Sequence, residues 1–199
     1  MAAALPAFTR LHALDDSRSG QAGHLLRRPE VTTLQARDAI PEDAAAMAAI
    51  YNQGIEDRIA TFETCLRSGE DVAKWFDGVH PIVVVERGGG IVAFAATSTY
   101  RPRQCYAGVA EFSVYVRRTE RGRGLGKLAL LLLMEAARKA GYWKLVSRVF
   151  VENAASRGLL KSLGFREVGV YEKHGQLDGV WRDVVIVERL LTDVGLEDS

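Results

Sequence analysis

Residues 118–127, which read RTERGRGLGK, place three glycines and three arginines between a strand-like apolar run and a leucine-rich helical run. Glycines have no side chain, so several backbone N–H groups can converge on one point. The N-terminus of a helix adds about half a positive charge and unpaired N–H groups. The segment therefore predicts a binding site for an anion such as a pyrophosphate, with Arg121, Arg123 and Lys127 adding charge around it.

Two well-known phosphate motifs do not fit this segment. The Walker motif needs Ser or Thr after its lysine, whereas Leu128 follows Lys127. The Rossmann fingerprint spaces its glycines as G-x-G-x-x-G, whereas Gly122, Gly124 and Gly126 alternate with single residues. A glycine-rich loop that only caps a helix is the simpler interpretation of the loop taken alone.

Strand-like and helix-like patterns alternate around the loop, and turn residues separate them. Helices are expected over residues 41–56, 68–76, 124–141 and 153–164, and Ser68 and Gly141 are expected to be an N-cap and a C-cap. Strands are expected within residues 31–40, as a short strand, and over 82–86, 91–98, 110–116, 144–151, 165–174 and 181–191, with 87–90 as a hairpin turn. The interleaving predicts the α/β or α+β class, with one central mixed β-sheet flanked by helices.

Composition limits the function classes. The chain has 199 residues, 48% hydrophobic, and its 26 Lys and Arg nearly balance 25 Asp and Glu, so nucleic acid is not an expected partner. Two cysteines and four scattered histidines form no metal-ligand spacing. No apolar run approaches the roughly 20 residues of a membrane helix, and the start does not read as a secretory signal. We expect a cytoplasmic protein with an N-terminal extension over 1–31, a folded domain over 32–192 and a tail over 193–199.

Two sequence blocks resemble the GNAT family of N-acetyltransferases. The first is FSVYVRRTERGRGLGKLAL and the second is FVENAASRGLLKSLGFREVG, in the order and at the separation expected for that family. The resemblance covers about residues 33–191. It implies acetyl-CoA as co-substrate, no metal, and a mixed sheet whose V-shaped opening holds the pantetheine arm.

Within the family, three stretches resemble the phosphinothricin and arsinothricin acetyltransferases: IYNQGIEDRIATFET, YRPRQCYAGVAEFSVYV and KHGQLDGVWRDVVIVERLL. The resemblance implies acetylation of the α-amine of a small glutamate analogue, which confers resistance, and a homodimer in which Trp181 packs near the subunit contact. Another amine substrate, such as a different amino acid, an aminoglycoside or a protein N-terminus, stays open. A catalytically silent acetyl-CoA-binding module is a further alternative.

The resemblance also assigns roles to individual residues. Acetyl-CoA is expected to pair with the strand backbone and to contact the glycine loop and the next helix start, through Val114, Tyr115, Val116, Arg121, Gly122, Arg123, Gly124, Leu125, Gly126, Lys127, Asn153 and Ser156. From the residues alone, Asn153 is equally well explained as a helix N-cap. The expected substrate-binding residues are Arg103, Phe62, Glu63 and Tyr106, because a guanidinium can hold an anionic group in two-pronged fashion.

Glu111 is the expected catalytic base. An alkyl ammonium must lose a proton before it can attack a thioester. Glu111 matches the family glutamate proposed for that step, and burial in an apolar strand would raise its pKa toward a useful value. From position alone, a solvent-exposed glutamate is favoured.

Leu160 stands where the family has Tyr or His as acid, so protonation of the leaving thiolate is expected from water or not at all. Tyr171 and His174 are weaker candidates for that acid, and His12, His24 and His80 are expected on the surface without chemical roles.

Overall fold

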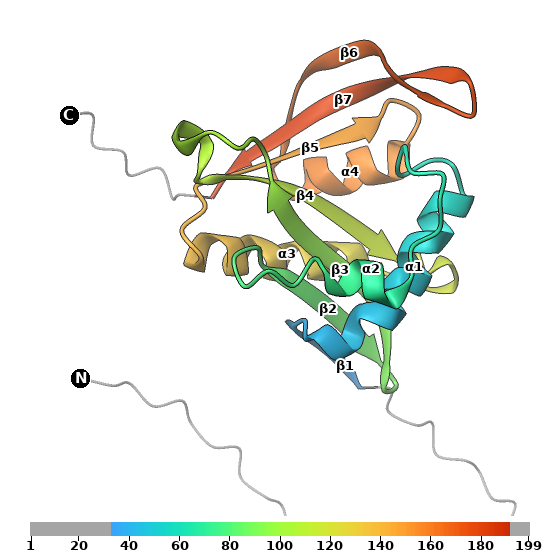
Figure 1. Ribbon diagram of the computed structural model, residues 1–199, viewed down its shortest axis with the longest axis vertical. Coiled ribbons are helices and arrows are strands. Elements are labelled where there is room, and N and C mark those ends of the chain that lie inside the picture. Colours follow the sequence, from blue (N-terminus) through green and yellow to red (C-terminus); the bar gives the residue numbers. More distant parts are fainter. Residues whose placement is uncertain (1–32, 192–199) are drawn as a thin grey trace, which may run out of the picture. The chain divides into compact units, whose positions relative to one another are not determined.

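A computed structural model describes residues 33–191, and the expected extension 1–31, the tail 193–199, His12 and His24 lie outside this range. The strands are β1 (Leu34–Asp38), β2 (Ile82–Arg87), β3 (Gly90–Thr99), β4 (Val109–Val116), β5 (Lys144–Phe150), β6 (Arg166–Leu177) and β7 (Val180–Leu190). The helices are α1 (Ala44–Glu56), α2 (Gly69–Ala73), α3 (Leu125–Lys139) and α4 (Ala154–Ser162) (Figure 1). The elements expected from the sequence pattern are therefore present in order.

One seven-stranded sheet carries the fold, with the strand order β1-β2-β3-β4-β5-β7-β6. Neighbouring strands are antiparallel except for β4 and β5, which run parallel. This arrangement confirms the predicted central mixed sheet with flanking helices.

The parallel strands β4 and β5 separate soon after they meet. They pair only at three positions, from Val109 opposite Lys144 to Glu111 opposite Val146. Strand β4 continues to Val116 without a partner on that side, while β5 pairs with β7 along its length. This separation is the V-shaped opening that the resemblance implies, and it leaves part of the β4 backbone available for hydrogen bonding.

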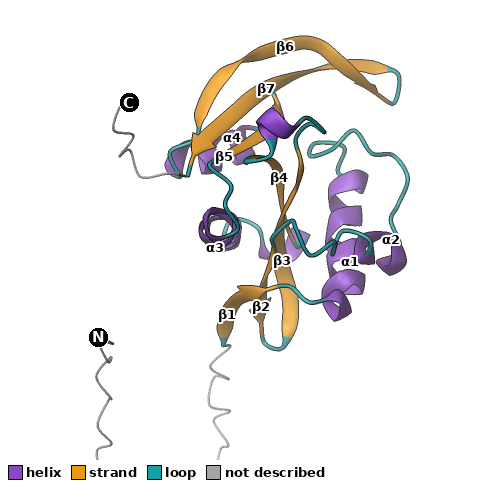
Figure 2. Cartoon of the chain, turned by 60° about the vertical axis from the view of Figure 1, so that its left-hand side comes forward, coloured by secondary structure: helices purple, strands orange, loops and turns teal. Residues whose placement is uncertain are grey.

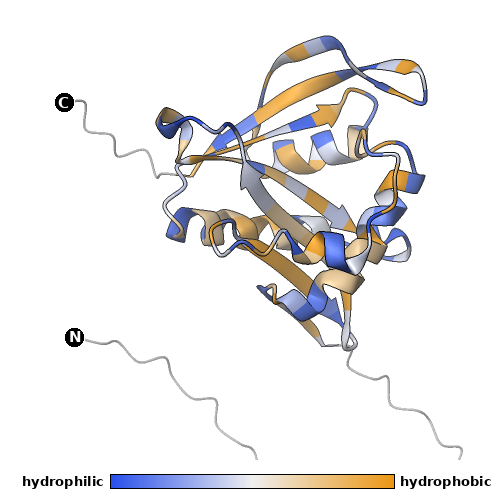
Figure 3. Ribbon diagram, viewed as in Figure 1, coloured by the Kyte–Doolittle hydropathy of each residue, from blue (hydrophilic) through white to orange (hydrophobic). Residues whose placement is uncertain are grey.

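Helices cover both faces of the sheet (Figure 2). The apolar residues of α3 pack with Phe112 and Leu145 on one face, whereas α1 and α2 pack with Val84 and Phe94 on the other. Strand β2 is hydrophobic along most of its length (Figure 3), and Val83, Val84 and Val85 are fully buried. Burial on both faces explains the unbroken apolar run in this strand, because each alternate side chain enters a different core.

Local sequence signals set most helix boundaries. Ser68 caps α2 by accepting a hydrogen bond from the Asp71 N–H at 3.1 Å, as expected. Gly88 and Gly89 form the predicted β2–β3 turn with φ values of 57° and 79°. The prediction for Gly141 is off by one position, because the C-cap of α3 is Ala140. Gly141 follows the cap with φ 90°, a left-handed conformation in which a Cβ would be strained. None of the described helices is long and apolar enough to cross a membrane.

Candidate functional site

The glycine loop and the start of α3 form one wall of a cavity of about 520 Å³, here called the loop cavity. Gly122 and Gly124 adopt φ values of 75° and 78°, and Gly124 is the N-cap of α3. These left-handed conformations let the chain turn sharply into the helix while its N–H groups stay uncovered. The first wall includes Arg121 and Lys127. The other walls come from the end of α1 and the loop after it, from β4 and from the start of α4, and include Asp57, Ile59, Val114, Tyr115, Val116, Asn153 and Ser156.

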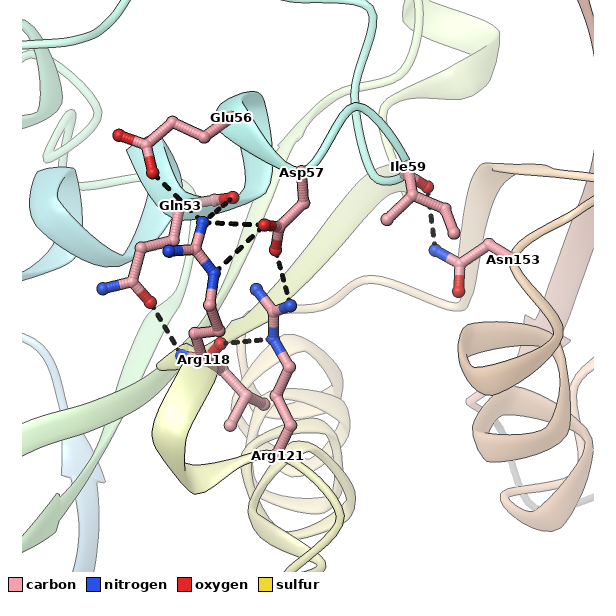
Figure 4. Close-up of polar contacts among 8 residues, drawn as sticks. Gln53, Glu56, Asp57, Ile59, Arg118, Arg121 and Asn153 are labelled. Carbon is pink, nitrogen blue, oxygen red and sulfur yellow. Dashed lines mark hydrogen bonds and ion pairs between the residues drawn. The ribbon is translucent and has the colours of Figure 1, made fainter.

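Two arginines of the loop bind the carboxylate of Asp57, just after α1 (Figure 4). Arg121 Nη1 lies 2.5 Å from Asp57 Oδ2, and Arg118 Nη2 lies 2.7 Å from Asp57 Oδ1. Partial burial alone would raise the pKa of Asp57, but hydrogen bonds from both guanidinium groups outweigh it and lower that pKa. The pair positions the loop against α1, so Arg121 shares its charge with Asp57 instead of offering all of it to a ligand.

The other cations of the loop differ from one another. Arg123 lies 3.4 Å from Glu120 and is not among the residues that line the loop cavity, whereas Lys127 in the first turn of α3 does line it. The expected cluster of three cations around one anion is therefore reduced to Lys127 and a partly neutralised Arg121. The left-handed glycines and the helix N-terminus supply the remaining positive potential.

Asn153 connects the start of α4 to the loop after α1. Its Oδ1 accepts a hydrogen bond from the Ser156 N–H at 3.1 Å, which makes it the N-cap of α4. Its Nδ2 donates to the Ile59 carbonyl oxygen at 3.0 Å, in the loop after α1 (Figure 4). The N-cap interpretation of Asn153 is confirmed, and the side chain also lines the loop cavity.

A second cavity, of about 500 Å³, adjoins the first and is here called the Glu111 cavity. Ala60, Val114, Tyr115, Asn153 and Ser156 line both cavities. Phe62 and Glu63, which were expected to bind substrate, line the Glu111 cavity together with Tyr51, Ser98, Glu111, Ser113, Ser147, Arg148, Phe150, Leu160 and His174. The structure thus brings the candidate base and two candidate substrate residues next to the space beside the glycine loop.

Glu111 is not surrounded by apolar groups, contrary to the expectation from its strand. Its side chain is 25% exposed, and its Oε1 accepts hydrogen bonds from both Nε and Nη2 of Arg148. The Nε distance is 3.2 Å. The apolar pattern of β4 predicts burial around Glu111, but the neighbouring strand β5 supplies a cation that this pattern cannot reveal.

The other two candidate substrate residues are Arg103 and Tyr106. Both belong to the loop between β3 and β4, where Arg103 is exposed and Tyr106 stacks edge-on with Tyr100 at 5.7 Å. Neither is among the residues that line the Glu111 cavity in the described part of the chain. Their substrate roles stay predictions, and Arg148 is the cation that the sequence analysis missed. The sequence feature that could have identified Arg148 is a charged residue within the otherwise apolar strand at 144–151.

Proton-donating groups near Leu160 are few. Leu160 is 3% exposed and packs in the core while lining the Glu111 cavity, so its side chain has no proton to give. Tyr115 stacks on Phe94, and burial raises its pKa well above the usual range, so its phenol stays protonated. His174 lines the cavity with its ring centroid 6.4 Å from that of Phe62, whereas the side chain of Tyr171 is exposed.

The surface assignment of His80 is wrong. Its side chain is 14% exposed, its Nδ1 lies 2.5 Å from Asp77 Oδ2, and its Nε2 lies 3.3 Å from Thr99 Oγ1. Its ring also stacks on Tyr142. The loop between α2 and β2 folds back onto the end of β3, which the local sequence around His80 does not indicate.

Over residues 33–191 no group of three or more His, Cys, Asp or Glu could hold a metal ion.

The sequence signature of the acetyltransferase (GNAT) family matches residues 47–165. An L-methionine sulfoximine/L-methionine sulfone acetyltransferase of Pseudomonas paraeruginosa is 34% identical over 157 residues, or 76% of this chain and 91% of that protein. A phosphinothricin N-acetyltransferase of Alcaligenes faecalis is 32% identical, over 86% of this chain and 88% of its own. A phosphinothricin acetyltransferase of Sinorhizobium meliloti, solved with acetyl-CoA, superposes with a TM-score of 0.74 at 27% identity, over 79% of this chain and 88% of its own.

The chain therefore belongs to the GNAT acetyltransferase family. The predicted membership, the fold and the acetyl-CoA-dependent N-acetyltransferase class are confirmed. Its curated relatives named above act on phosphinothricin and on methionine sulfoximine or sulfone, which are small amino acids.

Proposed function

We propose that the chain transfers the acetyl group of acetyl-CoA to the α-amine of a small amino acid of the phosphinothricin, arsinothricin or methionine sulfoximine kind. One observation carries the proposal: two cavities adjoin at Val114 and Tyr115, on the part of β4 that has left β5, and Glu111 lines one of them. The loop cavity has the glycine loop of an anion site, and the Glu111 cavity has a carboxylate that can accept a proton.

The residues of the loop cavity fit acetyl-CoA, which supplies the acetyl group as a thioester. The uncovered N–H groups at the start of α3, together with Lys127, would hold its pyrophosphate. The unpaired side of β4 from Val114 to Val116 would accept its pantetheine arm in the manner of an added strand. The shared lining of the two cavities then brings the reacting ends together.

Glu111 would act as general base for the amine. The amine arrives mostly as an ammonium, because alkyl ammonium groups have pKa values of about 8 to above 10. Glu111 takes one proton, the neutral nitrogen forms a bond to the acetyl carbon, and the carbon–sulfur bond breaks as the thiolate leaves. The nitrogen loses its second proton once the bond has formed, and water in the cavity would carry that proton to the thiolate, because Leu160 cannot supply one. Acetylation removes the positive charge of the substrate, which is a route to detoxification and resistance.

We also propose that the chain acts as a homodimer. Strand β6 is the edge of the sheet, and its side chains Val168, Val170 and Tyr171 are about half exposed, as is Trp181 of β7. An exposed apolar edge strand is a template for pairing with another chain.

The proposed activity can be tested directly with the purified protein. It is incubated with acetyl-CoA and each of L-phosphinothricin, L-methionine sulfone, an aminoglycoside, a peptide and no amine, and free thiol is followed with time. We expect thiol release with the amino acids, and mass spectrometry should find the N-acetylated product. Turnover with the aminoglycoside or peptide alone would replace the substrate assignment. Binding of acetyl-CoA without turnover of any amine would favour a silent binding module.

A further inference from the structure

The position of Arg148 follows from the geometry of the splayed strands. Glu111 is the last β4 residue that pairs with β5, opposite Val146. Side chains alternate along a strand, so Arg148 lies on the same face as Val146, one step further into the opening. The guanidinium therefore reaches across the gap to Glu111 at the point where the two strands part.

Arg148 is suited to bind a ligand as well as Glu111. Its side chain is 46% exposed within the Glu111 cavity, and both of its contacts to Glu111 go to the single oxygen Oε1. A guanidinium carries five N–H donors in a planar fork, so Nη1 is available to a second acceptor. Within residues 33–191 these remaining donors have no other protein partner, and a ligand carboxylate could take them.

The charges that line the Glu111 cavity indicate where an anionic group of a ligand would bind. Among the described residues that line the Glu111 cavity, it is the one arginine or lysine. The acidic lining residues are Glu63 and Glu111, and Glu63 is held by Arg67, whose Nη2 lies 2.6 Å from Glu63 Oε2. A ligand that carries an anion meets one strong cation in this space, and that cation stands beside the candidate base.

We propose that Arg148 is the anchor for the α-carboxylate of the substrate and that the Glu111–Arg148 ion pair selects zwitterionic α-amino acids; this inference rests on the proposed function. An α-amino acid carries its ammonium and carboxylate on the same carbon. Its two charges therefore match the adjacent carboxylate and guanidinium of the pair, with opposite signs facing. The substrate carboxylate bonds to the available Nη1 and draws the guanidinium away from Glu111, and the ammonium becomes the partner of Glu111.

The exchange of partners has a consequence for amines that lack a carboxylate. Such an amine cannot occupy Arg148, so its ammonium must compete with the guanidinium for Glu111. Arg148 therefore strengthens the binding of amino acids. It weakens the binding of amines that carry the same side chain but no carboxylate. Removing the guanidinium should weaken the binding of amino acids without weakening the binding of simple amines, which a purely structural role would not do.

The test compares L-methionine sulfone with the amine obtained by removing its α-carboxylate. Calorimetry in the presence of coenzyme A measures the affinity of wild type, Arg148→Gln and Arg148→Lys for each, so no turnover is required. We expect Arg148→Gln to weaken binding of the amino acid roughly 10- to 100-fold, as for a lost charge-assisted hydrogen bond. Binding of the amine should be unchanged or tighter, and Arg148→Lys should restore part of the amino-acid affinity.

Arg138→Gln is the matched control, because Arg138 pairs with Glu135 on the surface of α3. Circular dichroism of each variant checks the fold. Equal losses for both ligands in Arg148→Gln, or no loss for the amino acid, would overturn the anchor. Failure of wild type to bind any amino acid of the panel would also overturn it. Failure of the proposed function is a separate result, in which amino acids bind in this way and are not acetylated.

Discussion

At the scale of single residues, Glu111 is the proposed general base. We expect Glu111→Gln to keep acetyl-CoA affinity and to lower kcat roughly 10²–10⁴-fold near neutral pH, the usual range for a lost general base. The deficit should shrink as pH rises, because more of the amine then arrives neutral. The measurement is the pH–rate profile with saturating acetyl-CoA, with Glu135→Gln on α3 as control. An unchanged rate at neutral pH would show that the base lies elsewhere.

Asp43 illustrates a residue whose contribution is to stability. Its carboxylate accepts hydrogen bonds from Arg37 Nη1 at 2.8 Å and from the Ile40 N–H at 2.9 Å, just before α1. The bond from Arg37 lowers the pKa of Asp43, burial opposes that shift, and the Ile40 N–H adds to it. The charged form is therefore favoured in the folded protein.

We expect Asp43→Asn to lower the free energy of unfolding by about 1–3 kcal/mol at pH 7, because the Arg37 guanidinium loses its charged partner. A lowered folded-state pKa stabilises the protein above the unfolded pKa of about 3.9, and this stabilisation is lost as pH falls toward the folded value. Urea titrations of both proteins at several pH values should show the difference narrowing below about pH 4. A difference that does not change with pH would contradict the role of the charge.

At the scale of elements, the space around a helix glycine shows how closely that helix packs against its neighbours. A Cβ at Gly54 in α1 would lie 2.8 Å from Tyr115 Cε1, whereas a Cβ at Gly158 in α4 would meet no atom within 4 Å. Alanine is normally better than glycine inside a helix by about 0.5–1 kcal/mol. The two positions should therefore respond in opposite ways to the same substitution.

We expect Gly54→Ala to destabilise the protein by about 1–3 kcal/mol, because it overpacks the contact between α1 and β4. Its matched control, Gly158→Ala, should stabilise by about 0.4–1 kcal/mol. Urea unfolding of both variants measures the two changes. Stabilisation of equal size in both would mean that the Tyr115 ring moves aside without cost.

The loop before α3 permits a second comparison between elements. Gly124 and Gly179 both have φ 78°, but Gly124 lies in the loop cavity and Gly179 lies in the β6–β7 turn. Alanine at either position suffers the same left-handed strain. We expect Gly124→Ala to weaken acetyl-CoA binding by at least about tenfold (about 1.4 kcal/mol), and Gly179→Ala to leave it unchanged. Calorimetry with acetyl-CoA decides, and equal affinities in the two variants would contradict the role of the loop.

At the scale of the whole molecule, the exposed edge of the sheet is the expected subunit contact. Val170 on β6 is 52% exposed, and Val79 in the loop before β2 is 63% exposed. We expect wild type to behave as a dimer in light scattering at micromolar concentration. Val170→Lys should shift it toward the monomer, because a charge would be buried in the contact. Val79→Lys is the control and should leave the mass unchanged. A monomeric wild type would contradict the dimer.

The amino-acid sequence by itself determined the family, the order of the elements and the position of the glycine loop. These features depend on local patterns: alternation in the strands, apolar spacing in α1 and α3, and left-handed glycines at 122 and 124. Ser68 and Asn153 could be recognised as helix caps for the same reason, since a cap bonds to a residue three positions away.

Only the tertiary structure decided how charges pair across the sheet. The Glu111–Arg148 pair joins residues 37 positions apart, and the Asp57–Arg121 pair joins residues 64 apart. Each depends on which strands or helices become neighbours, which no local pattern contains. For the same reason the sequence analysis names the loop cation Arg103 and misses Arg148. It also places His80 on the surface, although the His80 ring contacts Asp77 and Thr99. The sequence determines which charged side chains are present, but the fold determines which of them become partners.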